Sequence, residues 1–198
     1  MSNLNSAVFL DRDGVLIEDV HLLTQPQKIR VLPSVVDALI NLHNNGFRLL
    51  VASNQTVVAR GLLSEDEMYS LQKQIEDQLM QQGAPPIDGF YACPHHPQAT
   101  LPAYRIDCQC RKPRPGLILH AAKEYQIDLS TSYMVGDRIT DIHAGVAAGC
   151  KTVLVQTGAH VAPTIQTSDI LDETIQPDFI CKDLGDAAEW ILAATSAR

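Results

Sequence analysis

Short apolar runs of strand length alternate along this chain with segments of helical period. Strands are predicted at 7–10, 47–53, 88–93, 132–137, 151–157 and 178–183, and helices at 34–44, 64–82, 116–126, 139–148 and 184–194. Strands that are separated by helices pair in parallel through right-handed crossovers, and the helices then cover both faces of the sheet. The pattern therefore predicts an α/β fold with a doubly wound, Rossmann-like parallel sheet. The 198 residues are expected to form a single domain, 1–198.

Charge and hydrophobicity argue against two classes of function. The net charge is −8 and no run of Lys or Arg occurs, so nucleic-acid binding is not expected. The first six residues lack the basic and apolar regions of a signal peptide, and no segment has the roughly 18 apolar residues of a membrane helix. We therefore expect no membrane association and a cytoplasmic location. The oligomeric state is left open, with a monomer as one alternative.

Polar side chains follow three of the predicted strands where each strand ends. Asp11 follows "AVFL", Ser53 ends "VAS" and Asp137 ends "MVGD". Ligands of an open parallel sheet bind outside the carboxyl ends of its strands, so these side chains should share one site. Asp11 and Asp13 would lie roughly 7 Å apart on one side of an extended chain, and their repulsion calls for a cation such as Mg²⁺. The alternative is that residues 11–14 form only a solvated turn.

Four segments together resemble the motifs of the haloacid-dehalogenase-like phosphohydrolases. They are "FLDRDGV" (9–15), "VASNQ" (51–55), "CRKPRPG" (110–116) and "MVGDRITD" (134–141), in the order typical of that family. The resemblance spans most of the chain. It implies a phosphatase of the same fold that acts through an aspartyl-phosphate intermediate and requires Mg²⁺.

The resemblance also implies catalytic roles for individual residues. Asp11 would attack phosphorus, and Asp13 would protonate the leaving group and then deprotonate the attacking water. Asp11, Asp137 and the backbone carbonyl of Asp13 would hold magnesium. Ser53 and Lys112 would hold the phosphoryl oxygens.

Further residues within or near these motifs are predicted to contact the substrate: Arg12, Asp19, Asn54, Gln55, Thr56, Arg111 and Arg138. Arg111 either meets a second phosphate or covers loop backbone. Asp19 and His21 either contact hydroxyl groups or belong to a merely polar loop. Asp141 either supports the metal end of the site or caps its helix.

Cysteines gather in the proline-rich stretch 93–115, which interrupts the alternation after the third strand. Cys93, His95, Cys108 and Cys110 supply the three sulfurs and one imidazole of a structural zinc site. His96 competes with His95 for this role. The alternative is that these are unpaired loop cysteines, but two closely spaced ligand pairs that flank one irregular segment favour zinc. Because the loop ends in Arg111 and Lys112, zinc would fix both beside the phosphate.

The choice of substrate rests on the cysteine loop. The loop is similar to that of D-glycero-D-manno-heptose 1,7-bisphosphate 7-phosphatases and of histidinol-phosphate phosphatases. The twelve residues between its two ligand pairs resemble the former enzymes, which lack a large cap domain and serve bacterial surface-glycan synthesis. Residues 15–22 and Thr56-Val57 depart from the heptose-enzyme pattern.

The predicted function is thus magnesium-dependent removal of the 7-phosphate from that heptose bisphosphate. Histidinol phosphate or another small phosphometabolite is the alternative substrate. A phospho-accepting signalling domain is the rival class, and it also places an Asp, a Ser or Thr and a Lys at strand ends. Asp13, two residues after the nucleophile, favours turnover over storage of the phosphoryl group.

Overall fold

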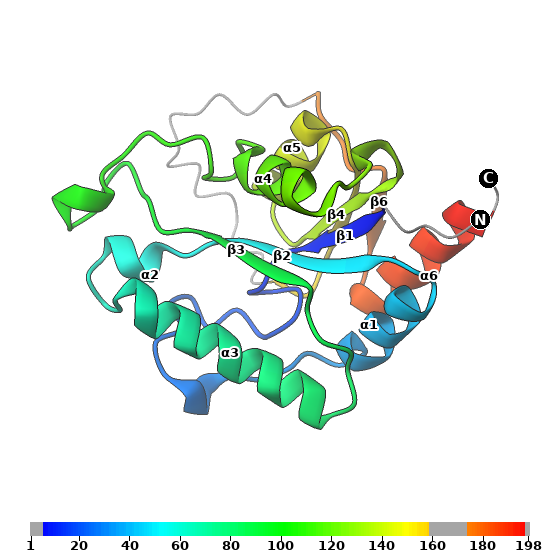
Figure 1. The fold of residues 1–198 in the computed structure, drawn as a ribbon, viewed down its shortest axis with the longest axis horizontal. Helices are drawn as coiled ribbons and strands as arrows, with labels where there is room; N and C mark the ends of the chain where they lie inside the picture. Colours follow the sequence, from blue (N-terminus) through cyan, green and yellow to red (C-terminus); the bar gives the residue numbers. More distant parts are fainter. Residues whose placement is uncertain (1–5, 159–173, 197–198) are drawn as a thin grey trace.

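The computed structural model describes residues 6–158 and 174–196, and its centre is a sheet of parallel strands. Figure 1 shows this sheet between two layers of helices. The strand order is β3-β2-β1-β4-β5-β6. The strands are β1 (Ala7–Leu10), β2 (Arg48–Asn54), β3 (Gly89–Cys93), β4 (Tyr133–Gly136), β5 (Lys151–Val155) and β6 (Phe179–Cys181). The chain runs outward from β1 to β3, then returns to β4 on the other side of β1. The reversal between β1 and β4 is the switch point at which such sheets bind ligands.

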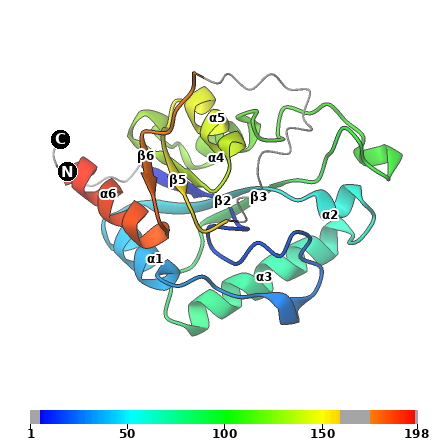
Figure 2. The same ribbon diagram turned by 180° about the vertical axis from the view of Figure 1, so that it is seen from behind.

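Helices cover both faces of the sheet, as the sequence predicts. One face carries α1 (Val35–Asn44), α3 (Glu65–Gln81) and α6 (Leu184–Ser196), and the other carries α4 (Gly116–Tyr125) and α5 (Ile139–Ala148). Figure 2 shows the same two layers from behind. Alternate residues of β1 enter different cores: Val8 and Leu10 pack toward the first face, Ala7 and Phe9 toward the second. The doubly wound parallel fold is therefore confirmed.

Two helix starts show what the sequence pattern did and did not predict. At α3, Ser64 Oγ accepts the N–H of Glu67 at 3.2 Å, and Glu67 Oε2 accepts the N–H of Ser64 at 2.7 Å. This is the predicted capping box. At α1, Ser34 precedes the helix as expected, but its φ of +64° is left-handed and its side chain makes no capping bond. Its Oγ instead accepts the N–H of Gly185 at 3.3 Å, which ties α1 to the start of α6.

The predicted insertion after the third strand is present, running from Cys93 at the end of β3 to α4. It contains one short 3₁₀ helix, Pro102–Tyr104. A four-residue helix, α2 (Thr56–Ala59), follows β2 and was not predicted. Across the described ranges no large cap domain is evident. The predicted polar loop around Pro163 falls in 159–173, outside the described residues.

Among the described helices, none is both long and apolar enough to cross a lipid bilayer.

Candidate active site

The carboxyl ends of β1, β2 and β4 bring the three predicted strand-end residues together. Asp11 follows β1, and its backbone N–H donates to the carbonyl of Val135 in β4 at 3.0 Å. Ser53, in β2, donates its hydroxyl to Asp11 Oδ1 at 2.7 Å. Asp137 follows β4 directly. Asp11, Ser53 and Asp137 are all buried, so their charges and dipoles act on one another with little screening by water.

Lys112 enters this carboxylate cluster from the end of the cysteine loop. Its Nζ lies 3.1 Å from Asp11 Oδ1 and 2.6 Å from Asp141 Oδ1, and it donates to the carbonyl of Ala52 at 2.7 Å. The lysine side chain is only 2% exposed. Burial acts to lower the pKa of Lys112, but the two carboxylates outweigh it and raise that pKa. Lys112 is therefore a buried cation beside Asp11.

Asn54 fixes the backbone of Lys112. Its side-chain amide donates to the carbonyl of Lys112 at 3.0 Å and accepts the N–H of Lys112 at 3.1 Å. The next residue, Gln55, donates its backbone N–H to the carbonyl of Cys93 at 2.8 Å. The end of β2 thus holds both ends of the cysteine loop. Asn54 was predicted to bind substrate; in the structure its side chain binds the backbone of Lys112.

Three carboxylates form a group that suits a divalent cation. One oxygen each of Asp11, Asp137 and Asp141 lie within 4.8 Å of one another. Asp137 Oδ1 is buried and has no hydrogen-bond partner among the described residues. Burial and repulsion from Asp141 and Asp11 raise the pKa of Asp137 to about 8. Burial likewise raises the pKa of Asp141 to about 6, against the effect of Lys112. An all-oxygen donor set with an unpaired buried oxygen fits magnesium.

Gly14 leaves the space that Asp137 occupies. Its φ is +81°, and a Cβ built there would lie 2.6 Å from Asp137 Oδ2. Thr157, which follows β5, donates its hydroxyl to the carbonyl of Gly14 at 2.6 Å. Sequence reasoning missed this contact, since nothing in the pattern around Thr157 pointed to the site.

Asp13 lies beside this group and is held by two neighbours. Arg12 donates from Nε and Nη2 to Asp13 Oδ2 at 3.1 and 2.8 Å. Gln55 Nε2 donates to the same oxygen at 3.0 Å and to Ser53 Oγ at 2.9 Å. Arg12 and Gln55 were predicted to contact substrate; in the structure their side chains are buried and contact Asp13.

The remaining predicted substrate contacts lie around the site. Arg138, whose side chain is 58% exposed, donates from Nη2 to Asp19 Oδ2 at 2.7 Å. Asp19 Oδ1 accepts the N–H of His21, whose backbone is left-handed with a φ of +68°. Arg111 Nη1 donates to the carbonyl of His95 at 3.2 Å, and Thr56 begins α2. These contacts order the loops that line the site.

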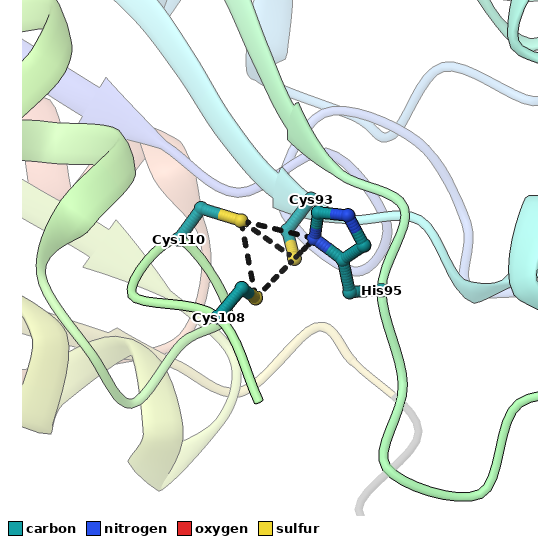
Figure 3. Close-up of side chains that lie close together, drawn as sticks. All are labelled: Cys93, His95, Cys108 and Cys110. Carbon is teal, nitrogen blue, oxygen red and sulfur yellow. Dashed lines mark hydrogen bonds between the residues drawn. The ribbon is translucent and has the colours of Figure 1, made fainter. Parts of the chain in front are cut away.

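The cysteine loop forms a second candidate metal site, in which Cys93, His95, Cys108 and Cys110 converge (Figure 3). The three Sγ–Sγ distances are 3.5, 3.1 and 3.2 Å, and His95 Nδ1 lies 3.8 and 3.4 Å from two of the sulfurs. A tetrahedral zinc ion with bonds of about 2.3 Å needs sulfurs about 3.8 Å apart, so the four atoms need only a small expansion to hold zinc. His96 is not in this cluster, and its Nδ1 accepts the N–H of Gln98. Of the two competing histidines, the structure brings His95 to the sulfurs.

Two comparisons relate the sequence to known proteins. A family model described as HAD-hydrolase-like matches residues 109–187. The D-glycero-beta-D-manno-heptose-1,7-bisphosphate 7-phosphatase of Yersinia pestis is 40% identical over 156 residues, which are 78% of this chain and 82% of that protein. The Haemophilus influenzae protein of the same name is 41% identical over 159 residues, 80% of this chain and 85% of that one.

The fold is also similar to that of a solved enzyme. The D,D-heptose 1,7-bisphosphate phosphatase from B. bronchiseptica, crystallised with magnesium and phosphate, superposes with a TM-score of 0.79. It is 32% identical, and the match covers 96% of this chain and 99% of that one.

Proposed function

Since this chain belongs to the haloacid-dehalogenase-like phosphatases, we propose that it hydrolyses a phosphomonoester in two steps through a phosphoryl group carried on Asp11. One observation supports this proposal most strongly. Buried carboxylates, the Ser53 hydroxyl and the Lys112 ammonium converge at the switch point of the sheet. A nucleophile, a cation site and donors for phosphoryl oxygens therefore lie within reach of one phosphate.

In the first step, a carboxylate oxygen of Asp11 attacks phosphorus and the bond to the leaving oxygen breaks. Asp13 gives its proton to that oxygen, so the product leaves as an alcohol. Ser53 and Lys112 donate to the non-bridging oxygens as phosphorus inverts. Asp11 and Asp137, with Asp141 beside them, would hold magnesium, which would offset the repulsion between a carboxylate and a phosphate dianion.

In the second step, Asp13 accepts a proton from a water molecule as that water attacks the phosphoryl group. The bond between phosphorus and Asp11 breaks, and inorganic phosphate is released. Asp13 is then protonated again and ready for another substrate. An acid and base two residues after the nucleophile is what distinguishes turnover from a stable phosphoprotein.

We propose that the cysteine loop holds a structural zinc ion. Three thiolates and one imidazole close a tetrahedron and leave no open position for substrate or water. Burial raises the pKa of the Cys93 thiol, so a bound cation is needed to keep that sulfur ionised at neutral pH. The zinc would hold the loop that delivers Arg111 and Lys112. The three cysteines of this loop form no disulfide, which suits a reducing compartment, so we also propose a cytoplasmic location.

We propose D-glycero-D-manno-heptose 1,7-bisphosphate as the substrate, with loss of the 7-phosphate. The relatives that share about 40% of their residues with this chain carry that activity in their names. Arg111, Arg138, Asp19 and Thr56 would contact the part of the substrate that lies outside the reacting phosphate. Arginine suits a second phosphate because its planar fork matches a pair of phosphoryl oxygens.

The proposal is tested by phosphate release from a panel of phosphomonoesters with and without magnesium. The panel contains the heptose bisphosphate, histidinol phosphate and hexose phosphates. We expect the heptose bisphosphate to have the highest kcat/KM, and Asp11→Asn to abolish release. A preference for histidinol phosphate would overturn the substrate. A protein that becomes phosphorylated without releasing phosphate would favour the signalling class.

A further inference from the structure

The carboxylate of Asp13 is held unevenly by its neighbours. Its Oδ2 accepts three hydrogen bonds, two from Arg12 and one from Gln55. Its Oδ1 accepts only one, from Arg12 Nη2 at 3.1 Å. A carboxylate oxygen has two lone pairs, so Oδ2 is saturated whereas Oδ1 keeps an open position.

Arg12 is buried and holds Asp13. The residue is 1% exposed, and its Nη1 is buried with no hydrogen-bond partner in the described part of the chain. Asp13 is its ion-pair partner at 2.8 Å. A forked contact fixes the plane of the carboxyl group it binds.

Gln55 connects Asp13 to the nucleophile. Its Nε2 donates to Asp13 Oδ2 and to Ser53 Oγ, and Ser53 donates in turn to Asp11 Oδ1. This chain of hydrogen bonds runs from one catalytic carboxylate to the other through side chains that are buried. The separation of Asp11 and Asp13 is therefore set by Gln55 as well as by the backbone.

We propose that Arg12 and Gln55 are positioning residues that hold Oδ2 of Asp13, so that Oδ1 is the atom that carries the proton. This inference rests on the proposed function and deepens it. In the first step the proton on Oδ1 passes to the leaving alkoxide as the bond between that oxygen and phosphorus breaks. In the second step Oδ1 takes a proton from the attacking water. Oδ2 remains an acceptor in both protonation states, so the two contacts persist through the cycle.

The dependence of the rate on the leaving group tests this role. An alkoxide needs a proton to leave, whereas a 4-nitrophenolate does not, so loss of a well-placed acid slows the alkyl ester more. The experiment compares kcat/KM for heptose 1,7-bisphosphate and 4-nitrophenyl phosphate, because that ratio reports the steps up to release of the alcohol. Arg12→Lys keeps the charge and loses the fork, and Gln55→Glu keeps the shape and loses the donor.

Gln72 supplies a matched control. It is 2% exposed, and its Nε2 donates to the carboxylate of Glu76 at 3.0 Å on α3, away from the site. Gln72→Glu therefore makes the same chemical change in a buried glutamine without touching Asp13. Melting temperature and zinc content of all variants establish that they are folded.

We expect Gln55→Glu and Arg12→Lys to lower kcat/KM for heptose 1,7-bisphosphate, the alkyl ester, more than for 4-nitrophenyl phosphate, the aryl ester. The two reductions should differ by about tenfold or more. Gln72→Glu should change neither value. Equal losses on both esters, or no loss in a folded Gln55→Glu protein, would overturn the inference. Asp13→Asn is the benchmark. If it shows no selective loss on the alkyl ester, the role of Asp13 as acid fails, and this inference falls with it.

Discussion

Magnesium affinity should weaken steeply between pH 8 and pH 6, because protons and metal compete for Asp137. Burial and neighbouring carboxylates raise the pKa of this side chain to about 8. About half of the Asp137 carboxyl groups are ionised at pH 8 and about 1% at pH 6. The dissociation constant should therefore rise about 50-fold over this range, and magnesium should release about 0.9 proton at pH 7.

Isothermal titration of the zinc-loaded protein with magnesium measures both quantities. Titrations at pH 6, 7 and 8, each in two buffers of different ionisation enthalpy, give the affinity and the number of protons released. Asp137→Asn should remove most of the proton release at pH 7, because Asp141, with a pKa of about 6, is largely ionised there. An affinity that changes less than about threefold across the range, with no proton release, would refute the reasoning.

The raised pKa of Asp137 also makes the stability of the fold depend on pH. A carboxyl group with a raised pKa in the folded state contributes stability that is fully present below its ordinary value of 3.8 and is lost as pH rises through about 8. In the protein without magnesium, ionisation of the buried Asp137 therefore lowers the unfolding free energy most at alkaline pH. Magnesium should raise the melting temperature more at pH 8 than at pH 6.

Other substitutions test the rest of the site. Gly14→Ala should weaken magnesium binding in titrations, because the added Cβ would lie 2.6 Å from Asp137 Oδ2. Gly83→Ala is the control, since Gly83 also has a positive φ but has open space around it. It should lower the unfolding free energy by about 1 kcal/mol and leave the magnesium affinity unchanged. Lys112→Met leaves the buried carboxylates of Asp11 and Asp141 without their cation. It should lower the unfolding free energy measured in urea by about 3 kcal/mol and abolish phosphate release. Unchanged stability would contradict the ion pairing of Lys112 with these carboxylates. Cys108→Ser should reduce zinc content well below one ion per chain, measured by elemental analysis, and lower both melting temperature and kcat.

The sheet, the strand-end residues and the cysteine cluster could be predicted because each has a local signature. An apolar run such as Ala7–Leu10 followed by Asp11 marks a strand end, and parallel topology then places it beside Ser53 and Asp137. The cysteines were found by their spacing. In these cases a short stretch of sequence is enough to predict the strand end or the metal site.

The contacts of Arg12, Asn54 and Gln55 could not be predicted in this way. These residues lie in the right motifs, but whether their side chains meet a ligand or another part of the protein depends on packing between distant segments. Asn54 binds a backbone 58 residues later, and Gln55 reaches an aspartate 42 residues earlier. The helix Thr56–Ala59 was missed because four residues are too few to show a period.

The cysteine loop is attached at both of its ends. The residues that position the catalytic groups are therefore separate from the middle of the loop. Cys93 and Lys112 are pinned to the end of β2, so the stretch between the two ligand pairs can change in length or composition while the reacting groups stay in place. The entropic cost of closing a loop grows only slowly as residues are added to it. Exchange of residues 96–107 should therefore be a route to new substrate preferences that leaves the hydrolytic chemistry intact.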